Sequence, residues 1–174
     1  GAQDIFLRDT QTPSTSLVSV TTAGAQVNGL SSAPVISDDG RYVAFESVAT
    51  NLIASDGNGV RDIFLRDTQT PLTSRVSVTT AGAEVNGVSS SPAISDDGRY
   101  IAFESIATNL ITSDGNGVAD IFLRDTQTPL TSRVSVNTTG AEANGASSAP
   151  SISADGHYIA FQSLASNLIA GDGN

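Results

Sequence analysis

The residues best suited to chemistry lie in a short acidic loop that occurs three times. Its first copy reads Asp56-Gly-Asn-Gly-Val-Arg-Asp62, so two oxygen-bearing side chains two residues apart are followed by an aspartate after a glycine-containing turn. Carboxylate and amide oxygens are the ligands that Ca²⁺ prefers. The spacing therefore predicts a candidate calcium site. Its candidate ligands are Asp56, Asn58 and Asp62, with Asp114, Asn116 and Asp120 in the second copy and Asp172, Asn174 and Asp4 in the third.

The same loop has a second interpretation that needs no metal. Asp and Asn side chains accept hydrogen bonds from nearby backbone N–H groups in Asx turns, and a complete EF-hand-type loop would need more ligands and a terminal bidentate glutamate. The turn interpretation is favoured, so calcium is an optional ligand and no cofactor is required. The third copy separates the two interpretations, because Asp172 and Asn174 would need Asp4 of another subunit to complete a metal site.

The remaining residues offer little for catalysis. The chain has no Cys and a single His, His157, which stands at a repeat position that is Arg in the other copies. Nucleophilic sites of the Ser-His or Cys-His type need a His held by unlike neighbours, so we expect no catalytic residues and no enzyme. The acidic pair Asp38-Asp39 is predicted to serve a turn, since Ala154 replaces its first member in the third copy.

The overall charge narrows the choice of partners. The chain has 18 Asp and Glu but only 8 Lys and Arg, which gives a formal net charge of -10 at pH 7. A chain this acidic is repelled by phosphate backbones, so we expect no nucleic-acid partner. No apolar run approaches the roughly 18–20 residues of a membrane span, so no membrane partner is expected either.

The candidate residues recur because the chain consists of three copies of a 58-residue unit, 1–58, 59–116 and 117–174. The first two units agree at 47 of 58 positions and the last two at 44. Copies this similar imply recent duplication or deliberate engineering. A regular period of this length indicates a repeat fold in which each unit is one supersecondary element.

Each unit is predicted to contain four short strands, which in the best example span 34–37, 41–47, 62–67 and 74–80. These segments are rich in β-branched and aromatic residues, and no window has a useful helical period. Asp38-Asp-Gly40 joins the first two strands as a tight hairpin. A repeated four-stranded antiparallel sheet predicts an all-β chain with the blades of a β-propeller. An open β-solenoid is the alternative, and its coils are usually shorter.

The motif from Ser37 to Phe45, followed by Asp62-Ile-Phe-Leu-Arg-Asp67, resembles the PD40, or WD40-like, repeat of TolB-type propellers. That family pairs a Ser-x-Asp-Gly-Lys/Arg turn and an Ala-Phe strand with an Asp-Ile-Tyr/Phe strand. The resemblance covers all three units and implies blade architecture. Longer units of this kind are similar to repeats in bacterial secreted or envelope proteins, which implies a secreted, periplasmic or cell-envelope location for a natural parent. Function does not follow from the fold.

The strand order places two complete blades at 34–80 and 92–138, with half blades at 4–21 and 150–163. Half blades leave unpaired sheet edges, which invite pairing with another chain. We therefore expect a propeller closed by oligomerisation through composite blades. A six-bladed homodimer is favoured because two-fold oligomers are the commonest, and a nine-bladed homotrimer comes next.

Two further sets of repeated polar residues receive structural interpretations. The arginines Arg8, Arg66 and Arg124 are expected to form ion pairs, since a guanidinium bonds a carboxylate through two parallel hydrogen bonds. Ser31-Ser32 and their copies precede the strand that lines the channel of a propeller, and they predict a solvated channel that could hold a small polar ligand.

The favoured function is a non-catalytic, self-assembling scaffold. The alternative is a secreted or periplasmic module that binds protein, peptide or glycan.

Overall fold

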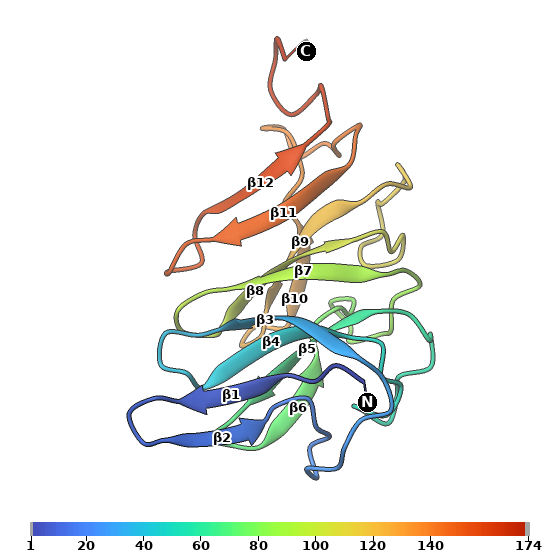
Figure 1. Ribbon diagram of the computed structural model, residues 1–174. Helices are drawn as coiled ribbons and strands as arrows, with labels where there is room; N and C mark the ends of the chain where they lie inside the picture. Colours follow the sequence, from blue (N-terminus) through green and yellow to red (C-terminus); the bar gives the residue numbers. More distant parts are fainter. Residues whose placement is uncertain (1, 173–174) are drawn as a thin grey trace.

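Short β-strands make up the regular structure of the described residues (Figure 1). The computed structural model describes residues 2–172, and within that range it has twelve short strands and no helix. The strands form four antiparallel sheets, two of four strands and two of two strands. The predicted all-β fold with four-stranded antiparallel blades is therefore confirmed. Over the same range, no helical segment has the length and apolar character needed to cross a bilayer.

The two complete blades share one strand order. In each, consecutive strands are neighbours in the sheet, which is the predicted meander. The first blade consists of β3 (Ser31–Ile36), β4 (Tyr42–Ser47), β5 (Asp62–Asp67) and β6 (Leu72–Arg75). The second consists of β7 (Ser89–Ile94), β8 (Tyr100–Ser105), β9 (Asp120–Asp125) and β10 (Leu130–Arg133).

The two-stranded sheets lie at opposite ends of the stack in Figure 1. β1 (Phe6–Asp9) pairs with β2 (Ser14–Leu17), and the two hold the third and fourth strand positions of the repeat. β11 (Ser147–Ile152) pairs with β12 (Ile159–Ser163), and these hold the first and second positions. The structure thus has the predicted division into two complete blades and two half blades.

The middle strands of each blade are covered on both faces because they are apolar on both faces. In the first blade, Phe45 of β4 lies opposite Phe64 of β5, with ring centroids 6.1 Å apart, and both rings are fully buried. Ile5 and Val18 of the N-terminal unit pack on this blade from one side. Ile101 of the second blade joins the core on its other side. Successive sheets are therefore stacked face to face.

Successive sheets also meet along their first strands. β3 contacts β7, and β7 contacts β11. The turns that follow these strands are linked by backbone hydrogen bonds, from the Asp38 amide to the Asp96 carbonyl and from the Asp96 amide to the Ala154 carbonyl, each 3.0 Å long. Four-stranded meanders stacked in this way are the blades of a β-propeller.

The hairpin between the first and second strands is the predicted tight turn. Gly40 has a φ of +72° and its amide donates to the Ser37 carbonyl at 3.0 Å. Asp39 Oδ1 accepts from the Ser37 hydroxyl at 2.7 Å and from the Arg41 amide at 3.0 Å. The turn role predicted for the acidic pair is confirmed at Asp39.

The first strand of the blade begins earlier than predicted, at Ser31 instead of Pro34. The pairing with β4 continues past the proline because a bulge between Ser32 and Val35 shifts the register. Ala33 lies in this bulge with a φ of +48°, a conformation that the sequence pattern does not announce.

The fourth strand was predicted over 74–80 but spans Leu72–Arg75. Val76 and Val78 are buried, as their alternation indicates. Val78, however, leaves the sheet and forms an isolated bridge with Glu84. The alternation of apolar residues therefore indicates that these side chains are buried. It does not show that the strand continues to pair in the sheet.

Candidate functional site

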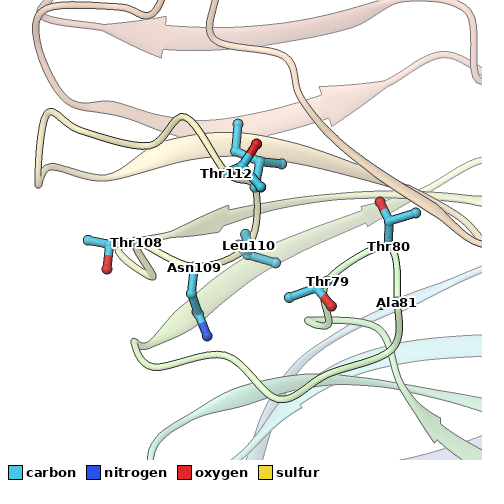
Figure 2. Close-up of a pocket in the computed structure, with 8 residues that line it drawn as sticks. Thr79, Thr80, Ala81, Thr108, Asn109, Leu110 and Thr112 are labelled. Carbon is cyan, nitrogen blue, oxygen red and sulfur yellow. The ribbon is translucent and has the colours of Figure 1, made fainter.

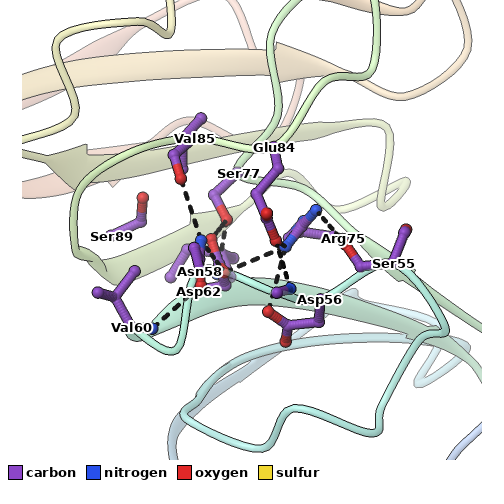
Figure 3. A network of polar contacts seen from close by, with 12 residues as sticks. Ser55, Asp56, Asn58, Val60, Asp62, Arg75, Ser77, Glu84, Val85 and Ser89 are labelled. Atoms are coloured by element: carbon purple, nitrogen blue, oxygen red, sulfur yellow. Dashed lines mark hydrogen bonds and ion pairs between the residues drawn. The ribbon is translucent and has the colours of Figure 1, made fainter.

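The acidic loop of the first complete blade is organised around Asp62, the first residue of β5. Its side chain is fully buried and accepts hydrogen bonds from the Ser77 hydroxyl at 2.6 Å and from Asn58 Nδ2 at 3.0 Å (Figure 3). Asn58 also donates to the Val85 carbonyl at 3.1 Å, and its Oδ1 accepts from the Val60 amide at 3.0 Å. The last contact is the predicted Asx turn.

An arginine that the loop motif does not contain occupies the middle of this cluster. Arg75 Nη1 lies 2.7 Å from Glu84 Oε1, 3.3 Å from Asp62 Oδ2 and 3.4 Å from Asp56 Oδ1. The guanidinium is almost completely buried, and Nη2 donates to the Ser55 carbonyl at 3.1 Å. Three carboxylates therefore share one buried cation (Figure 3).

The second complete blade repeats this network. Arg133 Nη1 bonds Glu142 and lies 3.3 Å from Asp120 and 3.6 Å from Asp114. Burial, together with the nearby charge of Asp120, raises the pKa of Asp114 to about 6. Burial and the nearby charge of Asp62 likewise raise the pKa of Asp56.

The acidic side chains of the second blade have the donor atoms for a metal. One oxygen from each of Asp114, Asp120 and Glu142 lies within 4.8 Å of the other two, and such oxygens suit Ca²⁺. Arg133 already supplies a positive charge among them, so a metal ion would have to displace its guanidinium. Asn116 is occupied as Asn58 is, since its Oδ1 accepts from the Val118 amide at 2.9 Å. Calcium binding at the complete loops stays a prediction.

The first unit lacks both the arginine and the glutamate of this network. Leu17 stands at the position of Arg75, and Gln26 stands at the position of Glu84. The loop motif alone named neither Arg75 nor Glu84 as a member of the site. The sequence does hold a signal that could have linked the two residues. In the first unit, the cation and the anion are both replaced by uncharged residues.

The third predicted ligand set is not assembled within one chain. Asp4 Oδ1 accepts from the Ser19 hydroxyl at 2.9 Å, as Asp62 does from Ser77. Asp172 follows β12 in the chain, and β12 lies at the end of the stack opposite to β1 (Figure 1). Asn174 lies outside the described residues.

The ion pairs predicted for Arg66 and Arg124 were wrong. Arg66 Nη1 donates to the Thr73 hydroxyl at 2.9 Å and to the Thr21 carbonyl of the preceding unit at 3.2 Å. Arg124 makes the same contacts with the second blade's threonine and the preceding unit's carbonyl. Arg8, in the N-terminal sheet, donates to Thr15 at 2.9 Å. Within residues 2–172, these arginines have no carboxylate partner, and the first two join neighbouring units.

The neighbouring aspartates are paired with other arginines. Arg41 donates to Asp67 through Nε at 3.0 Å and Nη2 at 2.6 Å, and its guanidinium lies 4.7 Å from the centre of the Tyr42 ring. Arg41 and the bonds from Thr70 hold the pKa of Asp67 well below its usual range. Arg99 and Asp125 repeat the pair in the second blade.

The third copy of this arginine position is His157, which has no counterpart of Asp67 in its own half blade. Its side chain is 74% exposed, and Nδ1 lies 3.6 Å from Asp155 Oδ2. The equivalent of Asp67 is Asp9, in β1. Hydrogen bonds from Thr12 and Gln11 lower the pKa of Asp9, which therefore remains ionised at neutral pH. The two members of the pair lie on different half blades.

A groove of about 640 Å³ opens between two loops of the second unit (Figure 2). Thr79–Ala81 forms one wall and Thr108–Thr112 the other. No lining residue is charged, and most of the exposed lining is apolar. Its polar groups already have partners within the chain, since Asn109 Oδ1 accepts from the Asn86 amide at 2.9 Å and the Thr80 hydroxyl accepts from the Thr131 amide at 3.1 Å. Such a lining suits an uncharged ligand with an apolar face.

The first serine of each predicted channel pair is buried. The Ser31 hydroxyl bonds the Ser47 hydroxyl at 3.0 Å, and the Ser47 hydroxyl donates to the Leu30 carbonyl at 3.1 Å. Ser89 and Ser147 make the same contacts in their units. These hydroxyls tie the first strand to the second, so they are not free to hold a ligand. A small polar ligand in the central channel stays a prediction.

No protein-family model matches the chain, and no curated protein matches it at a significant level. Solved structures of TolB are similar to it. TolB from Acinetobacter baumannii aligns with a TM-score of 0.48 and 23% identity over 91% of this chain and 31% of its own. The putative TolB from Agrobacterium tumefaciens aligns with a TM-score of 0.47 and 16% identity, over 75% of this chain and 40% of its own. The chain therefore spans well under half the length of either protein.

Proposed function

We propose that the 174-residue chain is a non-catalytic β-propeller scaffold that closes a ring by joining its half blades to those of another copy. The observation that carries this proposal is the exposure of one aromatic ring. Phe6 of β1 is 64% exposed, whereas its equivalents Phe64 and Phe122 are fully buried in the complete blades. In the first complete blade, Phe45 of the neighbouring strand and Ile5 and Val18 of the preceding sheet cover this position, and the N-terminal sheet lacks both neighbours.

The missing strand has a counterpart at the other end of the chain. β12 corresponds to β4, which pairs with β5, and β1 corresponds to β5. Pairing in the same register would place Phe161 of one copy opposite Phe6 of the next. The end that carries β12 has two apolar side chains, Tyr158 at 74% and Ile169 at 64% exposure, whose equivalents Tyr42 and Ile53 are half-buried in the complete blade. Burial of this apolar surface against another copy would stabilise the junction.

The N-terminal sheet also offers a shaped recess. A groove of about 470 Å³ is lined by β1 and by the first hairpin, including Leu7, Ile36 and Gly40. At the equivalent place between the complete blades, the Tyr42 ring lies so close to Gly98 that a Cβ there would be 2.2 Å from the ring. Nothing in the described chain lies within 4 Å of a Cβ built on Gly40. The recess therefore suits Tyr158 of another copy.

Ring size follows from the number of copies. Two copies would form six blades and three would form nine, with the same junction in each case. The dimer is favoured because two-fold oligomers are the commonest. Sedimentation equilibrium separates the two, since the assembly mass is either twice or three times the chain mass of 17.7 kDa.

The substitution Phe6→Glu tests the junction directly. Because Phe6 is exposed in a single copy, the variant is expected to fold, but it would place a charge in the composite blade and yield monomers. Leu130→Glu is the matched control, since Leu130 is 53% exposed on β10 and its equivalent Leu72 stays 54% exposed in the blade that a complete blade follows. A wild-type chain that sediments as a folded monomer, or a Phe6→Glu variant that assembles as the control does, would overturn the proposal.

A second candidate function is a secreted or periplasmic module that binds protein, peptide or glycan. The groove in Figure 2 supports it, because its uncharged and mainly apolar lining suits the apolar face of a sugar ring or an uncharged peptide side chain. A glycan and peptide binding screen tests it, with Thr112→Trp as the variant that fills the groove. Binding that this exposed substitution does not weaken would exclude the groove as the site.

A further inference from the structure

We infer that the ring junction is controlled by pH through His157 of one copy and Asp9 of the next, an inference that rests on the proposed self-assembly. The two complete blades each hold their second and third strands together at the turn end with an arginine–aspartate pair. In a composite blade, the same two places are taken by His157 and Asp9. The junction is thus the one place in the repeat where a side chain that titrates near neutrality replaces a permanent cation.

Asp9 is arranged as Asp67 is, except for the missing cation. Asp67 accepts from the Gln69 amide at 2.9 Å, from Thr70 at its amide and hydroxyl, and then from Arg41. Asp9 accepts from the Gln11 amide at 2.8 Å and from the amide and hydroxyl of Thr12. The carboxylate is therefore fixed in place before any partner arrives.

The charged neighbours of His157 at the junction can be named from those of Arg41. Asp39, Tyr42 and Asp67 surround Arg41. By repeat position, His157 would face Asp155 and Tyr158 of its own copy and Asp9 of the next. The receiving groove is also lined by Arg8, Asp38 and Asp39.

Three other charged positions of the network are neutral at the junction, whereas Asp4 and Asp172 keep the aspartates of the acidic loop. Leu17 and Gln26 replace the arginine and glutamate of the acidic loop, and Gln162 stands where Glu46 and Glu104 stand in the complete blades. His157 and Asp9 therefore form the main opposite-charge contact of the composite blade.

The sign of the pH effect follows from the charges. An ionised carboxylate beside an imidazole favours the protonated imidazolium, so assembly takes up a proton. The copies therefore associate more tightly below the ordinary imidazole pKa of about 6.5 and more weakly above it. The equivalent arginines are 31–33% exposed, so we expect a change of about 1.5- to 5-fold in the dissociation constant per junction.

Sedimentation at about pH 5.5 and about pH 8, on either side of the imidazole pKa, tests the inference at constant ionic strength. The wild-type chain should associate more tightly at the lower pH. His157→Arg should associate tightly at both pH values, because it restores the pair of the complete blades. His157→Gln should associate weakly at both, and it serves as the control for every other titrating group.

The possible results separate the two proposals. Monomers at both pH values, in the wild type and in His157→Arg, would overturn the scaffold proposal and this inference with it. Rings whose stability changes with pH equally in the wild type and in His157→Gln would overturn this inference alone. Asp9→Asn is the second probe, and a wild-type pH response in that variant would also overturn it.

Discussion

The acidic loops of the two complete blades contain an arginine, whereas the N-terminal copy of the loop does not. Arg75 lies among three carboxylates, and in the first unit both this arginine and Glu84 are replaced by uncharged residues, Leu17 and Gln26. Because both residues change together, we infer that the arginine and the glutamate depend on each other as an ion pair. Asp62 and its hydroxyl donor Ser77 persist as Asp4 and Ser19, so they form the part of the network that the loop itself requires.

The substitution Arg75→Leu alone is the most severe way to break this comparison. It leaves Asp56 and Asp62 buried beside Glu84 without a cation, which should cost about 3–5 kcal/mol of unfolding free energy. The double variant Arg75→Leu with Glu84→Gln copies the first unit and should recover part of the loss. Chemical denaturation measures both. An equal loss in the single and double variants would show that the two residues are independent.

The glycines of the hairpins sharpen the contrast between an internal interface and the junction. Gly98→Ala would drive a Cβ into the Tyr42 ring and should cost about 2–3 kcal/mol. Gly40→Ala has the same positive φ but meets no atom in a single copy, so it should cost about 1 kcal/mol of folding stability. In sedimentation, Gly40→Ala should also weaken association. An unchanged association constant would argue against Tyr158 in this recess.

A smaller effect is expected from the buried carboxylate of the second blade. Because the pKa of Asp114 is raised to about 6 in the folded chain, the folded state binds this proton more tightly than the unfolded state. The contribution is fully present below about pH 4 and is lost as the pH rises to about 6. Asp114→Asn should therefore gain about 1–2 kcal/mol at neutral pH. Chemical denaturation of the wild type and of Asp114→Asn at pH values from about 4 to about 7 measures this change in unfolding free energy. Asp56→Asn is the matched variant of the first blade.

The smallest effect is expected from calcium removal. Since Arg75 and Arg133 supply the positive charge in the complete loops, EDTA should leave the melting temperature of the wild-type chain unchanged. The variant Arg75→Leu removes this cation and should gain stability when Ca²⁺ is added. Melting of the wild-type chain that falls in EDTA would instead support the predicted calcium site.

Much of the blade could be predicted from the sequence because its signals are local. The hairpin at Gly40 needs a positive φ, and the apolar character of β4 and β5 reports burial on both faces. The fourth strand was placed too late because the alternation of Val76 and Val78 reports burial, which a bridge to a loop satisfies as well as a sheet does.

The site was predicted less well, because its members come from separate parts of the unit. Arg75 enters the acidic loop from β6, 13 residues beyond Asp62. Asp67 follows Arg66 directly in the chain, but its ion-pair partner is Arg41, which lies 26 residues away. Pairing between charged side chains depends on which strands are neighbours, and the order of the residues does not show this.

The backbone bonds between successive hairpins give the stack a polarity. Each bond runs from the amide of one unit to the carbonyl of the next, so the series ends with the Asp38 carbonyl on one side and the Ala154 amide on the other. Copies that continue the series can add only head to tail. Growth of this kind stops when the rotation between units closes a circle, and it continues as a fibre when the rotation does not. The angle between adjacent sheets therefore decides whether these contacts produce a finite particle or an open filament.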